Sequence, residues 1–522
     1  MNCAPDSATP TTATLVSRWA VDPRAIFAVV LDEQGCARTI SYAEQLDRLR
    51  RTAAALRAAG VRRGDRVHLQ IANRPEFYDV WFASALLGAT LVPTGPQSTV
   101  DELRHVLADA APVVSIVPSD QVSVVHEAAA GLSALSVLAV DGDAPASLKL
   151  LTAGIDPGAA PDESPPGPTD VAAILYTSGT TSRPKGVLIT HANYLAVGRT
   201  VAEHLSITTA DRWLITLPLF HANAQYYCTM SALVSGASIV LAPRFSASAW
   251  GRQAAEHGAT LGSLFAAPIR MILARSEDRT DPRHRLRAVL FAQNLTDDQA
   301  ARFERQFNTR LLQLYGMTET VLPPTLNPDS PQRRWHSIGQ ALHGVEMRLA
   351  DEAGRPVPPG TPGELLIGGV PGQTLAAGYL NQPEATEATF GGGWLRTGDV
   401  VRLDDDGFYH FVDRTKDMIK RSGENIAAGE IERVVNDHQS VLECAAIGVP
   451  DPVRDEAVVV YAVARPGHRL DEHLLLDWCR ARLTDFKVPS TIVLVDALPQ
   501  TSVGKIRKDM LRRAGTLWHP SR

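Results

Sequence analysis

Cysteine is scarce in this chain of 522 residues, and none of it stands where cysteine chemistry would need it. The sequence has no Cys-X-X-Cys pair and no cysteine beside a histidine, and the number of cysteines is odd. The five positions lie far apart: Cys3, Cys36, Cys228, Cys444 and Cys479. The pattern argues against a thiol nucleophile, a zinc site and a disulfide framework. Unpaired thiols are typical of a reducing compartment, so we expect a cytoplasmic protein.

Long apolar runs and concentrated charge are also missing. The longest weakly polar run, residues 80–92, is interrupted by Ser84 and Gly88 and is shorter than the ~20 residues that span a bilayer. Residues 1–12 lack the basic start and apolar stretch of a signal peptide. A net charge of −6 with dispersed basic residues provides no surface for nucleic acid. We therefore expect neither a nucleic-acid partner nor a membrane.

The composition is that of an ordinary globular protein with ample core, since 45% of residues are hydrophobic and 21% are charged. At ~150 residues per domain, the length allows about three units. Residues 42–60 have helical periodicity, residues 65–71 alternate as a strand, and residues 77–87 and 89–93 read as a buried helix and a strand. This alternation, which continues to about residue 350, predicts doubly wound α/β subdomains with parallel sheets.

Two changes of pattern follow. Strand-like runs rich in glycine and proline, at 363–367 and 407–412, predict a small β-barrel-like subdomain. Charges crowd at residues 413–417, and strands and helices over 441–495 then lead to a basic final helix. We predict a large N-terminal domain over 1–413, a hinge at 414–416 and a small, mobile α+β domain over 417–522.

The run YTSGTTSRPKG, residues 176–186, carries the most information. An apolar strand leads into small and hydroxylated residues followed by Lys185, a pattern that offers backbone N–H groups, hydroxyls and an ammonium to a polyphosphate. Gly179 and Gly186 can adopt positive φ and allow the backbone to approach a ligand closely. The Walker pattern is excluded because no GK[ST] closes the loop. A polar surface hairpin is the alternative interpretation.

This loop resembles the phosphate loop of the adenylate-forming superfamily, which includes acyl- and aryl-CoA ligases, adenylation domains of peptide synthetases and beetle luciferases. Ser182 stands where most members have glycine, and Ser182-Arg183 resembles the crotonobetaine/carnitine–CoA ligases. Five later segments match the superfamily in order: 217–224, 313–320, 394–399, 411–432 and 499–508. The matches cover about residues 170 to 510, and the first lobe agrees in pattern only.

The segment 217–224 places an aromatic–histidine pair after a strand, which could be a packed core loop; the resemblance implies that it borders the acyl pocket. In 313–320 the resemblance implies that Tyr315 stacks on adenine, Thr318 binds phosphate and Glu319 helps to hold Mg²⁺. A hard cation prefers a carboxylate oxygen beside phosphate oxygens, and Gly316 lets the chain turn around the nucleotide. A surface glutamate after a strand is the alternative.

The remaining segments concern the ribose, the hinge and the mobile domain. The resemblance implies that Asp399 accepts hydrogen bonds from the ribose hydroxyls, that Arg414 contacts ribose or phosphate and that Lys416 is the hinge. The residues expected to line the CoA channel after domain rotation are Lys420, Gly423 and Glu424.

Lys505 aligns with the adenylation lysine, whose ammonium offsets charge in the transition state. A solubilising basic helix is an alternative for Arg507, Lys508, Arg512 and Arg513.

Together, the resemblance implies catalytic roles for Lys505, Glu319, Thr177, Lys185 and His221. The nucleotide-binding residues that it implies are Thr177, Ser178, Gly179, Thr180, Thr181, Lys185, Tyr315, Gly316, Thr318, Asp399, Arg414 and Lys505. The acyl pocket that it implies includes His221, Asn223, Ala224, Gln293 and Asn294. Glu319 is the implied metal ligand.

The implied activity is that of an ATP-dependent acid–CoA ligase, which uses ATP, Mg²⁺ and CoA to form acyl-AMP and then acyl-CoA. The acid is unresolved, because residues 291–297 depart from the Gly-Gly-Ala type of many relatives and no cage for a trimethylammonium group is visible. One alternative is a stand-alone adenylating enzyme that transfers the acyl group to a carrier-protein thiol or an amine-like nucleophile. Another is a non-catalytic nucleotide-binding relative, which intact Lys505, Glu319 and Asp399 argue against. The sequence leaves a homodimer open.

Overall fold

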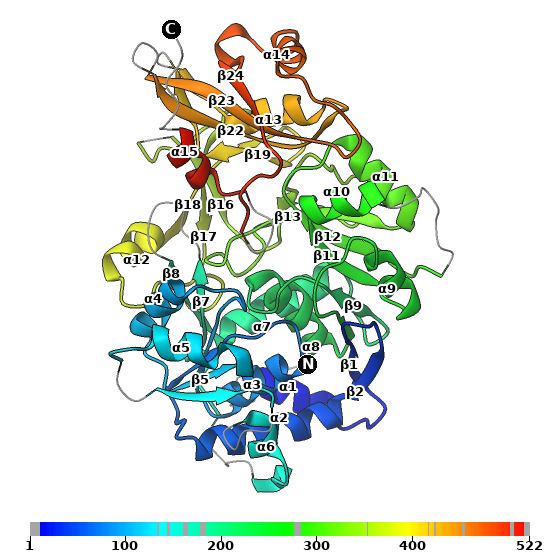
Figure 1. Ribbon diagram of the computed structural model, residues 1–522, viewed down its shortest axis with the longest axis vertical. Helices are drawn as coiled ribbons and strands as arrows, with labels where there is room; N and C mark the ends of the chain where they lie inside the picture. Colours follow the sequence, from blue (N-terminus) through cyan, green and yellow to red (C-terminus); the bar gives the residue numbers. More distant parts are fainter. Residues whose placement is uncertain are drawn as a thin grey trace.

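The computed structural model describes residues 11–132, 135–142, 147–159, 165–177, 184–275, 283–351, 353–415, 417–421, 424–451, 455–501 and 506–515. The small C-terminal domain, orange and red in Figure 1, lies at one end of the long axis, and the larger body fills the rest. Some residues that the sequence singles out lie outside the described ranges: Ser178, Gly179, Thr180, Thr181, Lys416, Gly423 and Lys505.

The first sheet of the large body is parallel except at one edge, where β7 and β8 pair antiparallel. Its strands, in spatial order, are β6 (Ser136–Ala139), β5 (Val114–Val117), β3 (Arg66–Leu69), β4 (Thr90–Pro93), β7 (Val171–Thr177) and β8 (Lys185–Thr190). The helices of this part are α1 (Thr12–Trp19), α2 (Tyr42–Ala58), α3 (Pro75–Leu86), α4 (Val100–Ala110), α5 (Val122–Ala128), α6 (Leu148–Thr152) and α7 (His191–His204).

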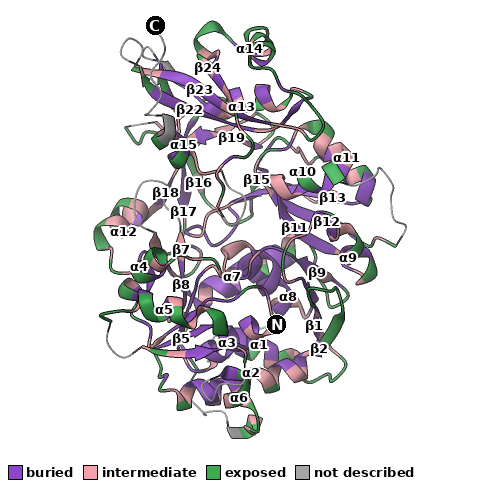
Figure 2. Cartoon of the chain, in the orientation of Figure 1, coloured by how far each residue is buried: buried purple, intermediate pink, exposed green. Residues whose placement is uncertain are grey.

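Helices cover both faces of this sheet, as the sequence predicted. Val114 and Ile116 of β5 belong to the large core that also contains residues of α2 and α3. Val117 belongs instead to a cluster with α4 and α5. Successive residues of a strand point to opposite faces, so the two groups of helices lie on opposite sides of the sheet. Buried strands between more exposed helices are visible in Figure 2.

The second sheet is parallel in its centre and antiparallel at both edges. Its strands, in spatial order, are β15 (Gln340–Ala341), β14 (Thr325–Leu326), β13 (Arg310–Tyr315), β12 (Ala288–Ala292), β11 (Leu261–Phe265), β9 (Arg212–Ile215), β10 (Ser238–Leu241), β1 (Ile26–Leu31) and β2 (Ala37–Ser41). Its helical segments are the π-helix η3 (Ala224–Met230), α8 (Ser231–Ser235), α9 (Trp250–Glu256), α10 (Ala266–Arg275) and α11 (Asp297–Phe307). The hairpin of β1 and β2 near the N-terminus thus completes the second sheet, although it precedes the first sheet in the sequence.

The subdomain predicted from the glycine-rich strands is a four-stranded antiparallel sheet. Its strands are β16 (Met347–Ala350), β17 (Gly363–Gly368), β18 (Trp394–Leu403) and β19 (Tyr409–Arg414), and α12 (Pro383–Phe390) lies against β18. The small domain contains β20 (Ile419–Arg421), β21 (Glu424–Ile426), β22 (Val441–Asp451), β23 (Asp455–Ala464), β24 (Thr491–Leu494), α13 (Ala428–Asn436), α14 (Glu472–Arg480) and α15 (Lys508–Gly515).

The apolar cores of the large body and the small domain are separate. The main core of the large body draws on both α/β sheets and on the antiparallel subdomain, with Tyr409 as its last buried member along the chain. The cores of the small domain begin at Ile419 and end at Leu511. The segment between these cores contains the predicted hinge at 414–416, whose role stays a prediction.

Local sequence signals explain where helices start. Ser41 caps α2 by accepting a hydrogen bond from the backbone N–H of Glu44. Thr99 and Glu102 form a reciprocal capping box at α4. Such caps satisfy backbone donors that have no partner inside the helix. No helix within the described ranges is both long enough and apolar enough to cross a bilayer.

His68 in β3 makes the stability of the large body depend on pH. It is fully buried, with Nδ1 2.7 Å from Oγ of Ser115 and Nε2 2.9 Å from Oγ1 of Thr94. Burial lowers the pKa of His68 from 6.5 to about 3, so the unfolded chain binds the proton first as pH falls. The stability that neutral His68 contributes is complete above about pH 6.5 and falls by up to about 1.4 kcal/mol per pH unit below it.

We expect the Tm of the wild type to fall between pH 7 and pH 5 more steeply than that of His68→Gln, which cannot titrate. Calorimetry at several pH values measures both slopes. His191, whose pKa burial lowers to about 4, is present in both proteins and contributes equally. Parallel slopes for the two proteins would contradict the assignment to His68.

Candidate active site

The ends of β7 and β8 flank the predicted phosphate loop. Thr177 ends β7 and pairs with Lys185, the first residue of β8. Gly186 does not have the positive φ that the sequence suggested. A Cβ at this position would lie only 2.7 Å from Cγ2 of Ile174. Glycine is therefore required here because the neighbouring strand packs closely, and not because of the turn conformation.

Tyr379 connects the loop strand to the predicted metal ligand. The ammonium of Lys185 lies 4.7 Å from the centre of the Tyr379 ring, and the Tyr379 hydroxyl donates to Oε1 of Glu319 at 2.9 Å. A backbone bridge between Val187 and Tyr379 holds this segment beside β8. The sequence prediction missed Tyr379, although the aromatic residue after Gly378 was a signal that could have found it.

Tyr315, Asp399 and Arg414 form a second cluster. The Tyr315 hydroxyl donates to Oδ2 of Asp399 at 2.5 Å, and Nε of Arg414 lies 3.2 Å from Oδ1. Burial and the adjacent carboxylate raise the pKa of Tyr315, so its phenol stays protonated as a donor. Although burial opposes its charge, Asp399 and Tyr315 raise the pKa of Arg414. A carboxylate has about four acceptor positions, and the role of Asp399 as an acceptor for ribose hydroxyls stays a prediction.

The two clusters form one charged site. Arg414 interacts electrostatically with Glu319 as well as with Asp399. Glu319 is 6% exposed, and a carboxylate in this setting suits Mg²⁺, which proteins usually hold with one or two carboxylates while substrate phosphates supply other ligands. Within the described chain, no cluster of three or more metal-binding side chains is present. Glu319 thus fits a metal ion that is shared with ATP.

The π-helix η3 packs against the Tyr315–Glu319 turn. The Tyr226 hydroxyl donates to the carbonyl of Thr318 at 3.2 Å. A Cβ on Gly316 would lie 2.5 Å from the Tyr227 hydroxyl, so Gly316 is needed for this close approach, and its φ is not positive. Val321 does adopt a positive φ of 59°. Such a value is strained for a β-branched residue, and both π-helices and backbone strain concentrate at functional sites.

The predicted acyl-pocket residues occupy two neighbouring loops. The ring of His221 lies tilted against that of Phe220, with ring centres 4.2 Å apart. Asn223, at the start of η3, accepts a 2.8 Å hydrogen bond from Ser263 through Oδ1, which orients its amide nitrogen. The next residue, Ala224, is buried.

On the other loop, Gln293 has a φ of 76°, and its carbonyl accepts from Gln313 at 3.0 Å. Asn294 is exposed, and its carbonyl accepts from Arg270 of α10 at 3.2 Å.

Two of the residues predicted for the CoA channel, Lys420 and Glu424, lie on β20 and β21 of the small domain. Lys420 is exposed, and its backbone N–H donates to Glu456 of β23 at 2.7 Å. Glu424 lies in β21, paired with Arg421. The loop that carries Lys505 is closed at its base by a backbone bridge between Gln500 and Ile506.

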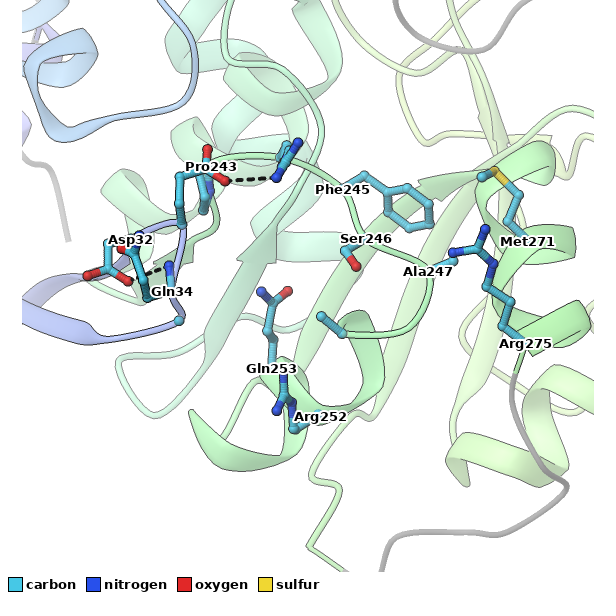
Figure 3. Close-up of a pocket in the computed structure, with 14 residues that line it drawn as sticks. Asp32, Gln34, Pro243, Phe245, Ser246, Ala247, Arg252, Gln253, Met271 and Arg275 are labelled. Atoms are coloured by element: carbon cyan, nitrogen blue, oxygen red, sulfur yellow. Dashed lines mark hydrogen bonds and ion pairs between the residues drawn. The ribbon is translucent and has the colours of Figure 1, made fainter.

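A surface pocket of about 370 Å³ lies elsewhere on the large body, between the β1–β2 turn, the loop before α9, and α10 (Figure 3). Arg244, Arg252 and Arg275 are among its lining residues. Thr177, Lys185, Glu319 and Asp399 do not line it. This pocket is therefore separate from the charged site of Glu319 and Asp399.

Known proteins are similar to this chain in both sequence and fold. AMP-binding enzymes match residues 17–380, and the AMP-binding enzyme C-terminal domain matches residues 430–505. The crotonobetaine/carnitine–CoA ligase of Proteus mirabilis is 35% identical over 489 residues, which are 92% of this chain and 94% of that protein.

Two solved structures have the same architecture. ATP-bound MatB from Rhodopseudomonas palustris superposes with a TM-score of 0.87 at 29% identity, covering 97% of this chain and 99% of that one. A benzoate CoA ligase from Burkholderia xenovorans LB400 superposes at 0.86 and 26% identity, covering 96% and 100%.

The apo form of MatB, with the same coverage and identity, superposes at only 0.75. This chain thus superposes better on the ATP-bound form of MatB than on its apo form. Because the family patterns match both domains and the relatives span nearly the whole chain, this protein belongs to the AMP-binding enzyme family and is an AMP-forming acyl-CoA synthetase, which uses ATP, Mg²⁺ and CoA to convert a carboxylic acid into its thioester through acyl-AMP.

Proposed function

We propose that the charged site formed by Lys185, Tyr379, Glu319, Arg414 and Asp399 is where the acid is adenylated. The observation that carries this proposal is the convergence of four segments. The loop strand β8, the turn after β13, the middle of β18 and the end of β19 bring one ammonium, one guanidinium and two carboxylates together. Such a constellation suits a nucleotide whose phosphates need cations and a metal while its ribose needs an acceptor.

In the first half-reaction, a carboxylate oxygen of the acid attacks the α-phosphorus of ATP, and pyrophosphate leaves. Thr177, Ser178, Gly179, Thr180, Thr181 and Lys185 hold the departing phosphates in this proposal. Glu319 would hold Mg²⁺ together with the phosphates, and the ion would supply positive charge there. Tyr315, Gly316 and Thr318 position adenine and the α-phosphate, and Lys505 orients the incoming oxygen. Catalysis of this kind consists mainly of positioning and electrostatic stabilisation.

In the second half-reaction, the CoA sulfur attacks the acyl carbonyl carbon and AMP leaves, so that a thioester replaces the mixed anhydride. We propose that the small domain turns about Lys416 between the two steps. The turn withdraws Lys505 and brings Lys420, Gly423 and Glu424 to the CoA channel. Hinges of this type absorb backbone rotation at a few residues between rigid bodies. The separate cores on either side of 414–416 support this division.

The acid lies against His221, Asn223, Ala224 and Gln293 in this proposal, with Asn294 near the entrance. The amide of Asn223, oriented by Ser263, offers a hydrogen-bond donor to a polar acid. The identity of the acid stays open, and carnitine is one candidate among several, since it is named for a relative at 35% identity.

The decisive experiment measures AMP release from ATP with a panel of small, aryl, fatty and betaine acids. Each acid is tested with CoA and, separately, with a phosphopantetheinylated carrier protein. We expect AMP release with at least one acid and CoA. Turnover with the carrier protein alone would overturn CoA as the acceptor, and exchange of pyrophosphate into ATP without any transfer would limit the enzyme to adenylation.

The cellular setting is also part of the proposal. The described cysteines, Cys36, Cys228, Cys444 and Cys479, are free thiols, which supports a reducing cytoplasm. A homodimer stays a prediction, which light scattering of the purified protein checks.

A further inference from the structure

Lys508 of α15 is not part of a solvated basic face, as the sequence alone allowed. Its side chain is 15% exposed, and its ammonium lies 2.8 Å from Oε1 of Glu432 in α13. Although burial opposes its charge, Glu432, Asp413 and Asp417 together raise the pKa of Lys508. An ammonium leaves water only when it is paired. A lysine surrounded by carboxylates in this way therefore makes a structural ion pair.

The carboxylates around Lys508 come from both sides of the predicted hinge. Asp413 ends the large body on β19, Asp417 follows the hinge, and Glu432 belongs to the small domain. Glu432 is itself fixed, since the backbone N–H of Ala446 donates to it at 2.8 Å. Arg512 of α15 adds a 2.6 Å ion pair with Asp417. The helix α15 is therefore attached to Asp417, directly after the hinge, and to α13 of the small domain.

Asp413 also joins the large body directly to the small domain. It is 3% exposed, and its Oδ2 accepts a 3.3 Å hydrogen bond from the backbone N–H of Gly429 in α13. A Cβ on residue 429 would lie 3.0 Å from the carbonyl of Val412, so β19 and α13 lie very close to each other. Rotation about residues 414–416 would separate Asp413 from both Gly429 and Lys508.

The orientation held by these contacts brings the base of the Lys505 loop to the large body. Gln500, at this base, donates to both carboxylate oxygens of Glu443 at 3.1 Å. Glu443 interacts electrostatically with Arg270 of α10, and Arg270 donates to the carbonyl of Asn294 beside the proposed acyl pocket. By contrast, Arg421 next to the predicted CoA loop bonds to the carbonyls of Phe486 and Val488 within the small domain. The arrangement also superposes better on ATP-bound than on apo MatB.

We propose that Lys508 is a positioning residue: paired with Glu432 of the small domain and attracted electrostatically to Asp413 at the end of the large body, it latches the small domain in the orientation that serves acyl-AMP formation, and the latch opens before the thioester forms. This inference rests on the proposed function of Lys505, which stands three residues before Lys508 in the sequence. Lys508 touches neither ATP nor the acid in this proposal. It acts by setting how often the Lys505 loop faces the site.

The first test compares the two half-reactions in four variants. We expect Lys508→Met and Asp413→Asn to slow acyl-AMP formation about tenfold, which corresponds to about 1.4 kcal/mol of orientation preference. Thioester formation from supplied acyl-AMP should stay within about twofold of the wild type, because that step uses the other orientation. Lys508→Arg should retain most of the wild-type rate of acyl-AMP formation, because arginine keeps the positive charge. Lys487→Met is the matched control, since Lys487 pairs with Glu430 at 2.8 Å, a contact that lies entirely inside the small domain.

A second measurement reads the orientation without any activity. Cys36, exposed on the large body, and a cysteine introduced by Leu474→Cys on exposed α14 can carry spin labels after Cys3→Ala, because Cys228, Cys444 and Cys479 are buried. We expect Lys508→Met and Asp413→Asn to broaden or shift the distance distribution. The distributions of Lys508→Arg and Lys487→Met should match that of the parent protein.

Three results would overturn the latch: unchanged distances in Lys508→Met, unchanged adenylation, or a parallel loss of both half-reactions with a lowered Tm. The last result would mean that Lys508 stabilises the fold and does not set the orientation of the small domain. If none of the acids tested supported acyl-AMP formation by the wild type, the proposed function would fail. The distance measurement would still decide whether the latch exists.

Discussion

Replacing Lys505 with alanine is expected to lower the rate of acyl-AMP formation by two to three decades, or about 3 kcal/mol of transition-state stabilisation. As the carboxylate attacks the α-phosphorus, negative charge accumulates between the two groups, and a preorganised ammonium offsets it at little cost in reorganisation. Thioester formation from supplied acyl-AMP should remain close to the wild-type rate. Rapid-quench measurements of the separate half-reactions check both expectations.

Arg507→Ala is the control for Lys505→Ala. Arg507 is a neighbouring cation, and it pairs with Asp509 of α15 at 3.0 Å. We expect this variant to change acyl-AMP formation by no more than about twofold, because a partly exposed ion pair contributes little. If Lys505→Ala slowed both half-reactions equally, Lys505 would not be specific to the first step and the proposed division of labour would be wrong.

Replacing Glu319 with glutamine is expected to slow acyl-AMP formation about a hundredfold and to move its Mg²⁺ dependence to higher concentrations. Glutamine keeps the shape and an oxygen that can accept from the Tyr379 hydroxyl, which now donates to Glu319 at 2.9 Å. The variant therefore removes the charge and leaves the contact. Initial rates measured over a range of Mg²⁺ concentrations at saturating ATP give both effects.

Tyr379→Phe is the matched variant, because it removes the hydrogen bond and keeps the carboxylate and the ring beside Lys185. Loss of a group that orients a metal ligand typically lowers metal affinity or activity 10- to 100-fold. For Tyr379→Phe we expect the rate of acyl-AMP formation to fall about tenfold, near the lower end of this range. An unchanged Mg²⁺ dependence in Glu319→Gln would exclude Glu319 as the metal ligand. A larger loss in Tyr379→Phe than in Glu319→Gln would transfer the main role to Tyr379.

Glycine positions illustrate how far local patterns can be interpreted. The sequence marked Gly186 and Gly316 as residues with special function, and both do lie at the site. The reason inferred for Gly186 was its capacity for positive φ, and for Gly316 it was a bend around the nucleotide. The structure gives neither residue a positive φ: a side chain would collide with Ile174 in one case and with the Tyr227 hydroxyl in the other. Those neighbours belong to an adjacent strand and to a π-helix about ninety residues away, which local patterns do not encode.

The amino-acid sequence by itself determined the family, the two kinds of sheet and the order of the segments, and it predicted which residues serve phosphate, ribose and metal. These properties are carried by neighbours along the chain, where spacing and side-chain chemistry are visible directly. Only the tertiary structure decided that Tyr379 joins Lys185 to Glu319, that Asn294 is exposed, and that Lys508 lies among carboxylates from both sides of the hinge. Contacts of this kind join residues from distant segments, and they exist because the packing of sheets and helices around shared cores brings those segments together.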